Sequence, residues 1–176
     1  MTLPDSISPF IVNVVLADRG QTDSNGKIGL LGAGWSAVAV GPNGDIPTQV
    51  VAVFVEAPWN ECNKIVQVSM ALMNADGRFV QVPGSPEPAN SDGSGPLRFN
   101  QEITFSPPEG APPATAGTAS FMIELMGGLP VGPGTYRWVV EIDGKSNPSW
   151  STGFSVIQPP SVFRSNPNRG TGPTAF

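Results

Sequence analysis

Short runs of alternating apolar and polar residues recur along this chain, with the period of a β-strand that buries one face. The clearest case is 65–73, where every second residue is apolar: Val66, Val68, Met70 and Leu72. Further strand-like runs lie at 10–16, 28–31, 37–40, 49–56, 78–82, 99–105, 119–126, 135–142 and 150–157. No window shows the 3.6-residue period of an amphipathic helix, so the pattern predicts an all-β protein.

Turn-forming residues separate these runs, with 21 glycines and 20 prolines in 176 residues. The strongest turn signal is Asn25-Gly26, because both residues tolerate positive φ angles. After it, 28–31 predicts a short strand, and a cluster of glycines predicts a sharp corner before Trp35, which we expect in the core. A phosphate-binding loop fits less well, because the glycine spacing is not the dinucleotide pattern and no helix follows.

The number and spacing of the strands predict an antiparallel immunoglobulin-like β-sandwich. Gly134-Thr135-Tyr136, followed by alternation, is typical of a late strand in such sandwiches. The turn at 74–77 predicts a hairpin between 65–73 and 78–82. The sequence predicts an extended N-terminal arm (1–9), one sandwich (10–157) and an extended C-terminal tail (158–176). Within the sandwich, 83–98 predicts a long Pro/Gly-rich loop.

Composition limits the chemistry that the chain can perform. Histidine is absent and cysteine occurs once, at Cys62, which excludes disulfide frameworks, the usual Cys/His zinc sites and histidine-dependent nucleophilic catalysis. Net charge is −5 and the nine basic residues are scattered singly, so we expect neither nucleic acid nor a membrane as partner. The N-terminus has no basic start of a signal peptide, which predicts a protein made in the cytoplasm.

Few side chains suggest a site. Asp18, Asp23 and Asn25 are a weak calcium candidate, because the closing glutamate of a calcium loop is missing. Trp35 and Trp59 are a possible ligand platform, and the glutamates that flank Trp59, Glu56 and Glu61, would suit a sugar or simply be solvated. Cys62 fits a small buried apolar residue better than a nucleophile. We therefore expect no enzyme and no cofactor or metal.

The segment 158–176 has no strand pattern but carries spaced apolar and basic residues, which are candidate anchors on a partner: Val162, Phe163, Arg164, Arg169 and Phe176. All 14 acidic residues precede it, so residues 1–157 carry a net charge of −7 and the tail carries +2. A basic tail with apolar anchors is suited to docking on an acidic neighbouring copy.

Four motifs carry a resemblance to a known family: Ala17-Asp18, Asn25-Gly26-Lys27, Leu31-Gly32-Ala33-Gly34-Trp35 and Pro58-Trp59. Together they resemble an uncharacterised bacterial and phage domain family, over roughly residues 10–157. That family looks like an immunoglobulin-like β-sandwich without an established activity. The resemblance therefore implies a fold and brings no mechanism.

Taken together, these features predict a non-enzymatic structural protein, an accessory or decoration component of a bacteriophage capsid, located in the virion. Its expected partners are the major capsid protein or copies of itself, held through the extended termini. The alternative is a soluble bacterial immunoglobulin-like domain that binds a glycan or small ligand at a loop end near Trp35 and Trp59.

Overall fold

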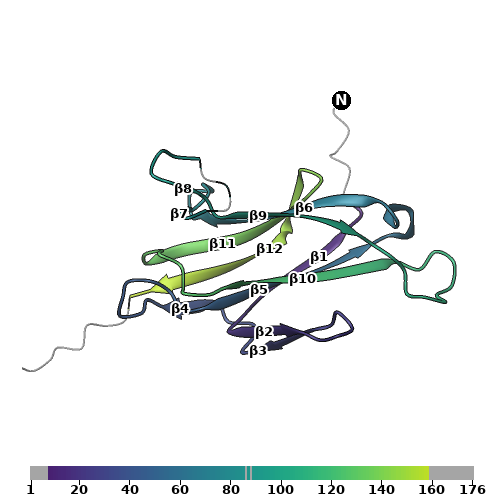
Figure 1. The fold of residues 1–176 in the computed structure, drawn as a ribbon, viewed down its shortest axis with the longest axis horizontal. Helices are drawn as coiled ribbons and strands as arrows, with labels where there is room; N and C mark the ends of the chain where they lie inside the picture. The colour runs from purple at the N-terminus through teal and green to yellow at the C-terminus, as the bar shows by residue number, and fades with distance from the viewer. Residues whose placement is uncertain (1–7, 86, 88, 159–176) are drawn as a thin grey trace, which may run out of the picture.

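The computed structural model describes residues 8–158 except 86 and 88, and this part of the chain is built from β-strands (Figure 1). Its only helical element is a single 3₁₀ turn, Trp59–Glu61. The strands are β1 Ile11–Ala17, β2 Arg19–Thr22, β3 Ile28–Leu31, β4 Ala37–Ala39, β5 Gln49–Ala57, β6 Ile65–Asn74, β7 Gln81–Pro83, β8 Ser94–Pro96, β9 Arg98–Thr104, β10 Gly117–Leu125, β11 Gly134–Ile142 and β12 Lys145–Ile157. The predicted all-β class is confirmed.

Two larger sheets form the body of the molecule and enclose its core (Figure 1). One has three antiparallel strands in the order β1-β5-β10, and the other has five in the order β4-β12-β11-β6-β9 and curls along its length. In the second sheet β4 pairs with β12 in parallel, so the expectation of purely antiparallel pairing is wrong at this edge. The corner at 32–36 causes this, because it carries the chain from the end of the β2–β3 hairpin to the opposite sheet.

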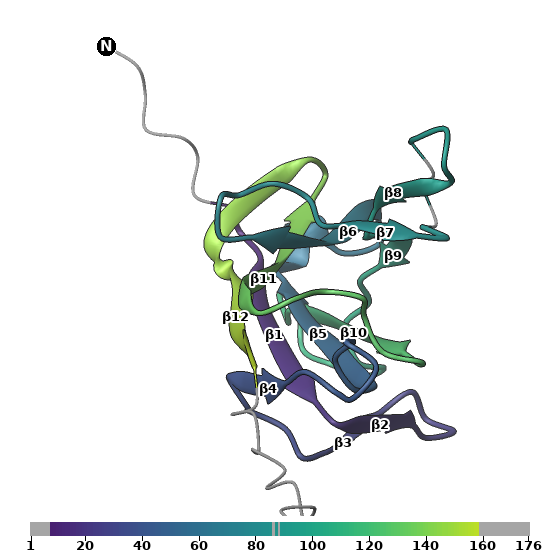
Figure 2. The ribbon, with the colours of Figure 1, turned by 90° about the vertical axis from the view of Figure 1, so that its left-hand side faces the viewer.

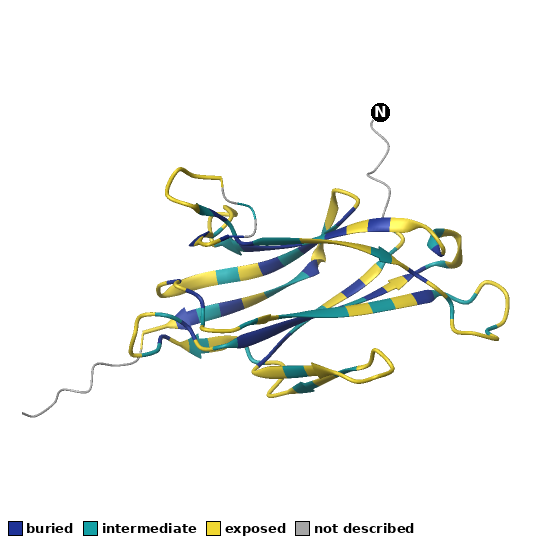
Figure 3. Ribbon diagram, viewed as in Figure 1, coloured by how far each residue is buried: buried dark blue, intermediate teal, exposed yellow. Residues whose placement is uncertain are grey.

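The core fills the space between these sheets, and Figure 3 shows the buried residues alternating with exposed ones along the strands. The face predicted for 65–73 is confirmed, because its four apolar side chains are all buried. Trp138 and Val140 of β11 are fully buried, as their alternation predicts. The largest buried side chains are Trp138, Trp150, Phe105, Leu16, Ile46 and Met70.

The predicted loop 83–98 includes a strand, β8, which forms a small antiparallel hairpin with β7 at the start of the segment. Leu97 is buried, and the hydroxyl of Ser85 donates a 2.6 Å hydrogen bond to the carbonyl of Pro96. The predicted hairpin between 65–73 and 78–82 forms only beside its turn. There Met73 and Phe79 make a bridge, and the N–H groups of Asn74 and Val80 donate to the carbonyls of Arg78 and Leu72, both at 2.9 Å. β9 occupies that edge of β6 instead, since its longer alternating run makes a seven-residue ladder with β6.

The β2–β3 hairpin stands outside both sheets. Its first strand, β2, lies in a polar segment without a strand pattern, so it is not among the strands expected from the sequence. Figures 1 and 2 place the hairpin against the outer face of the three-stranded sheet, on the side away from β11 and β12. This position leaves a cleft between the tip of the hairpin and the sheet.

Candidate functional site

The outer face of the three-stranded sheet is divided into a covered half and an open half. Cross-strand register places its outward side chains in four rows: Ala17–Val50–Glu124, Val15–Ala52–Met122, Asn13–Phe54–Ser120 and Ile11–Glu56–Thr118. The hairpin covers the first two rows, and Val50 and Ala52 are fully buried as a result. The last two rows remain open.

Gly20 allows the hairpin to lie this close to the sheet. A Cβ atom at this position would lie 2.7 Å from the sulfur of Met122 and 3.1 Å from a methyl carbon of Val50. A larger residue at position 20 would therefore push the hairpin outward unless Met122 moved aside. The absence of a side chain at position 20 thus permits this close approach of the hairpin to the sheet.

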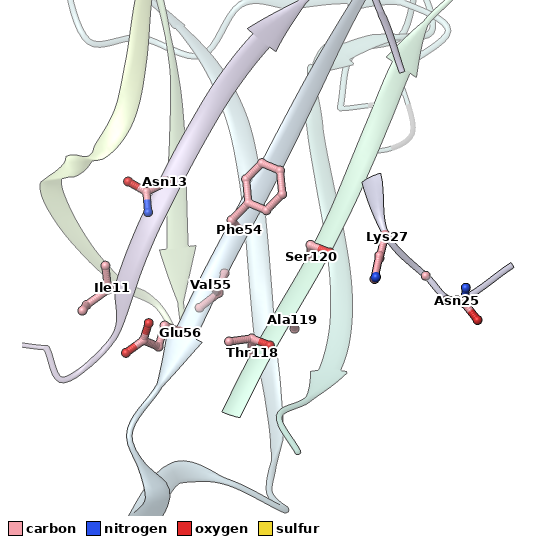
Figure 4. A pocket seen from close by; sticks show the side chains of 11 residues that line it. Ile11, Asn13, Asn25, Lys27, Phe54, Val55, Glu56, Thr118, Ala119 and Ser120 are labelled. Carbon is pink, nitrogen blue, oxygen red and sulfur yellow. The ribbon is translucent and has the colours of Figure 1, made fainter. Parts of the chain in front are cut away.

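A cleft of about 560 Å³ lies over the open rows, between the sheet and the tip of the hairpin (Figure 4). Phe54, half-buried, forms its floor, with Asn13 and Ser120 on either side in register. Glu56 lies in the next row, between Ile11 and Thr118. The cleft is lined by Ile11, Asn13, Asn25, Gly26, Lys27, Phe54, Val55, Glu56, Thr118, Ala119 and Ser120.

The polar side chains of the cleft are available to a ligand. Those of Asn13, Glu56, Thr118 and Ser120 are exposed and make no hydrogen bond to any described residue. Lys27 is also exposed, and within the described ranges it forms no ion pair. Figure 4 shows Lys27 on the hairpin side and Glu56 on the far side, with β10 between them and Phe54 farther along the sheet. The cleft therefore offers one negative and one positive group around an aromatic floor.

The tip of the hairpin is held by Asp23. One carboxylate oxygen of Asp23 accepts hydrogen bonds from the backbone N–H groups of Asn25 and Lys27, both at 2.8 Å. The N–H of Asp23 donates to the carbonyl of Lys27 at 2.9 Å, and Gly26 has a φ of 77°. This Asx-type turn fixes the backbone that carries Lys27.

The same contacts bear on the calcium candidate. Asp23 uses its carboxylate on the turn, while Asp18 points toward Gly32, at the other end of the hairpin. Among residues 8–158, apart from 86 and 88, no three His, Cys, Asp or Glu side chains come together as a metal-binding group. The structure therefore does not bring Asp18, Asp23 and Asn25 together around one point.

The two tryptophans predicted as a ligand platform do not share a surface. The corner before Trp35 is bonded to the carbonyl of Leu16, at one end of the three-stranded sheet, whereas Trp59 follows Ala57 at the other end. Trp35 is half-buried and packs edge-on against Phe154, with ring centroids 5.7 Å apart. Its core position agrees with the expected anchoring role.

Trp59 is 50% exposed at the start of the 3₁₀ turn. Of its flanking glutamates, Glu61 pairs with Lys64 at 3.1 Å, and Glu56 instead lies in the cleft over the sheet. Cys62 is a buried free thiol, as predicted, and its sulfur lies 3.6 Å from the carbonyl oxygen of Pro58. The two glutamates therefore lie at different sites and do not flank Trp59 together.

The sequence pointed to Glu56 but missed Asn13, Phe54 and Ser120. A signal was present for Asn13, the single polar residue in the apolar run 10–16. Phe54 gave none, because β5 is apolar almost throughout and its outward face resembles its inward face. The tail anchors Val162, Phe163, Arg164, Arg169 and Phe176 lie outside the described residues.

An edge of the sheet adjoins the cleft. β10 is the last strand of its sheet, and beyond a bridge from Thr118 to Ser106 its outer edge has no strand partner in the described part of the chain. The open stretch runs from Ala119 to Leu125. An unpaired edge of this length is a template for a further strand.

Sequence comparison places the chain in a family. The profile described as "Family of unknown function (DUF6941)" matches residues 13–156. The chain belongs to DUF6941. The match confirms the expected membership in an uncharacterised domain family, and it includes every residue of the DUF6941 cleft except Ile11. No curated protein matches the sequence. Among the residues that the structure describes, no helix has the length and apolar character to cross a membrane.

Proposed function

We propose that this DUF6941 protein is a non-enzymatic structural protein, an immunoglobulin-like β-sandwich that joins other protein chains in a larger assembly. The resemblance to a family with phage members favours a bacteriophage particle as this assembly. The protein would be an accessory or decoration component of its capsid. In this proposal the protein is made in the bacterial cytoplasm and becomes part of the virion.

The order of the strands supports the immunoglobulin-like assignment. The sheet β1-β5-β10 corresponds to strands A, B and E of that fold, and β12-β11-β6-β9 corresponds to G, F, C and C′. Tyr136 supplies a second argument, because its hydroxyl bonds back to Gly132 at the start of β11, two residues before the buried Trp138. A tyrosine corner at this place is a hallmark of such sandwiches.

The open edge of β10 is the observation that carries the proposed assembly role. Unpaired N–H and C=O groups on an edge strand gain hydrogen bonds when an extended segment of another chain lies beside them. Soluble proteins commonly protect such edges with lysine, proline or a bulge, and between Ala119 and Leu125 the only charged residue is Glu124. The acidic character of this edge suits a basic segment such as the tail of a neighbouring copy.

Sedimentation tests this proposal. The full-length protein is compared with a version that ends at Ile157, each alone and with candidate phage particles. Self-association or particle binding by the full-length chain, and a folded monomer for the shorter one, would support assembly through the tail. If both versions are monomers and neither binds the particles, the proposal is overturned.

A pair of charge reversals tests the edge itself. Glu124→Lys places a positive charge beside the open edge of β10 and should weaken association of the full-length chain. Asp76→Lys, in the exposed turn at 74–77 and on no edge strand, is the matched control and should leave association unchanged. Equal effects of both reversals would assign the association to net charge and remove β10 as the docking edge.

A further inference from the structure

We propose that the cleft between the β2–β3 hairpin and the three-stranded sheet binds a small neutral saccharide. In this site Phe54 stacks against a sugar ring, and Glu56, Asn13, Ser120 and Lys27 hydrogen-bond its hydroxyls. The cleft would bind a saccharide, whereas the docking edge would bind a protein segment. This inference therefore goes beyond the assembly role, and each proposal can fail without the other.

The floor of the cleft is suited to the apolar face of a sugar. A pyranose ring presents C–H groups on its faces and hydroxyls around its rim. The face of an aromatic ring carries the negative part of its quadrupole, which attracts such C–H groups. Phe54 is half-buried at the centre of the cleft rather than packed into the core, so its ring is available for this contact.

The groups around Phe54 are suited to the hydroxyl rim. Asn13 and Ser120 are its direct cross-strand neighbours, and side chains so paired have Cβ atoms about 5 Å apart. An amide and a hydroxyl therefore flank the ring on opposite sides, and both can donate and accept hydrogen bonds. Neither is engaged by another described residue. A hydroxyl-rich ligand satisfies both, whereas an apolar ligand would leave them unpaired.

Charge narrows the class of ligand. Glu56 on the far side of the cleft accepts hydrogen bonds from hydroxyls, and charge-assisted bonds of this kind are the stronger ones. Lys27 on the hairpin side donates to hydroxyl or acetamide oxygens (Figure 4). A strongly anionic ligand would meet repulsion from Glu56, and a cationic one would meet repulsion from Lys27. A neutral saccharide uses both groups.

The wall that carries Lys27 is fixed by contacts at both ends of the hairpin. At one end, the missing side chain of Gly20 lets the hairpin rest on Met122 and Val50. At the other end, the carboxylate of Asp23 holds the turn. The cleft of about 560 Å³ falls within the ~300–1,000 Å³ typical of small-molecule sites. The backbone turn that carries Lys27 is thus formed before a ligand binds.

NMR titration of the full-length protein tests the site. The probes are cellobiose, N,N′-diacetylchitobiose and, as the anionic arm, digalacturonic acid. We expect saturable shifts of the amide signals of Asn13, Phe54 and Ser120 with at least one neutral disaccharide, and weaker binding of the anionic one. A free peptide of residues 158–176 is titrated in parallel as the competing occupant.

Variants assign the binding to the cleft. Glu56→Gln should weaken binding about tenfold, through loss of the charge-assisted bonds. Phe54→Leu should abolish detectable binding, because it removes the aromatic face and keeps an apolar side chain. Asp23→Ala should weaken binding by releasing the wall, whereas Asp23→Asn retains the acceptor oxygen and should bind normally. Glu102→Gln, in the other sheet, is the control and should leave the affinity unchanged.

Three results would overturn the saccharide site. The first is the absence of saturable shifts with every disaccharide, and the second is an affinity of the Glu56→Gln and Phe54→Leu variants equal to that of the unmodified protein. The third is that the tail peptide, and no disaccharide, shifts the signals of the cleft. The last result would extend the docking edge of β10 into the cleft and so strengthen the assembly proposal. Sedimentation measures that proposal separately, so failure of one is distinguishable from failure of the other.

Discussion

The hydroxyl of Tyr136 donates a 2.9 Å hydrogen bond to the backbone carbonyl of Gly132, and this bond closes the turn that leads into β11. The ring of Tyr136 stacks on Phe154 of the neighbouring strand, with centroids 5.7 Å apart. Trp138, on the same face of β11, is fully buried between the sheets. The bond therefore fixes the start of the strand whose side chains form the centre of the core.

Tyr136→Phe removes only this hydrogen bond and keeps the stacked ring. We expect a loss of about 1 kcal/mol in the free energy of unfolding, measured by urea denaturation. Ser155→Ala is the control, because the Ser155 hydroxyl makes no hydrogen bond to a described residue, and its effect should stay within about 0.5 kcal/mol. If the two variants are equally stable, the corner does not stabilise the fold.

Substitution of two adjacent glycines can distinguish the cost of backbone strain from the cost of a steric collision. Gly127 and Gly128 both have positive φ, at 83° and 81°, but only at Gly128 would a Cβ atom collide with a backbone oxygen, that of Ile46. Gly127→Ala should cost about 1 kcal/mol through strain alone. Gly128→Ala should cost distinctly more, because the bridge between Ile46 and Leu129 must open. Equal losses in thermal unfolding would contradict the collision.

The tryptophans differ in what they contribute to stability. Trp35→Ala should lower the free energy of unfolding by about 2 kcal/mol or more, since it removes an aromatic packed on Phe154. Trp59→Ala should cost less than about 1 kcal/mol, because half of this side chain is already exposed. Chemical denaturation of both variants checks the order. A reversed order would show that Trp59, rather than Trp35, anchors the sandwich.

The turn before β8 makes a pH-dependent contribution to the stability of the fold. The hydroxyl and the backbone N–H of Ser94 both donate to the carboxylate of Asp92, at 2.6 and 2.9 Å, and they lower the pKa of Asp92 below its ordinary value. A lowered folded-state pKa contributes stability above the unfolded pKa, which is lost as pH falls through the folded value. Ser94→Ala should raise the Asp92 pKa toward the ordinary value, as followed by NMR titration of the carboxyl carbon.

The conservative variant completes this comparison. Ser94→Thr keeps a hydroxyl in place and should leave the pKa of Asp92 lowered. An unchanged pKa in Ser94→Ala would mean that the backbone N–H alone sets the value.

Much of the strand content was predictable from the sequence, because alternation is a local property. The inward faces of β6 and β11 follow from every second residue, and the buried side chains agree with that alternation. The turn at Asn25-Gly26 was equally explicit, since Gly26 tolerates the positive φ of 77° that it adopts. The strand β2 was missed, because its four residues carry no apolar period and their pairing depends on β3.

Pairing between distant strands was not predictable. The expected partner of β6 was the next run, 78–82, yet β9 makes the longer ladder from farther along the chain. The parallel edge of β4 on β12 likewise joins residues 37–39 to the last strand. Such choices depend on the summed packing of whole strands, which no short window of sequence contains.

The sequence by itself determined which residues of the alternating strands face inward, where the chain turns and which chemistries its composition excludes, because these follow from residue type and local spacing. Only the tertiary structure decided that the hairpin lies over the outer face of β1, β5 and β10 and leaves a cleft beside its tip. That arrangement brings together Lys27, Phe54 and Ser120, which are far apart in the chain. Their meeting depends on the close approach at Gly20, a contact that no periodic pattern encodes.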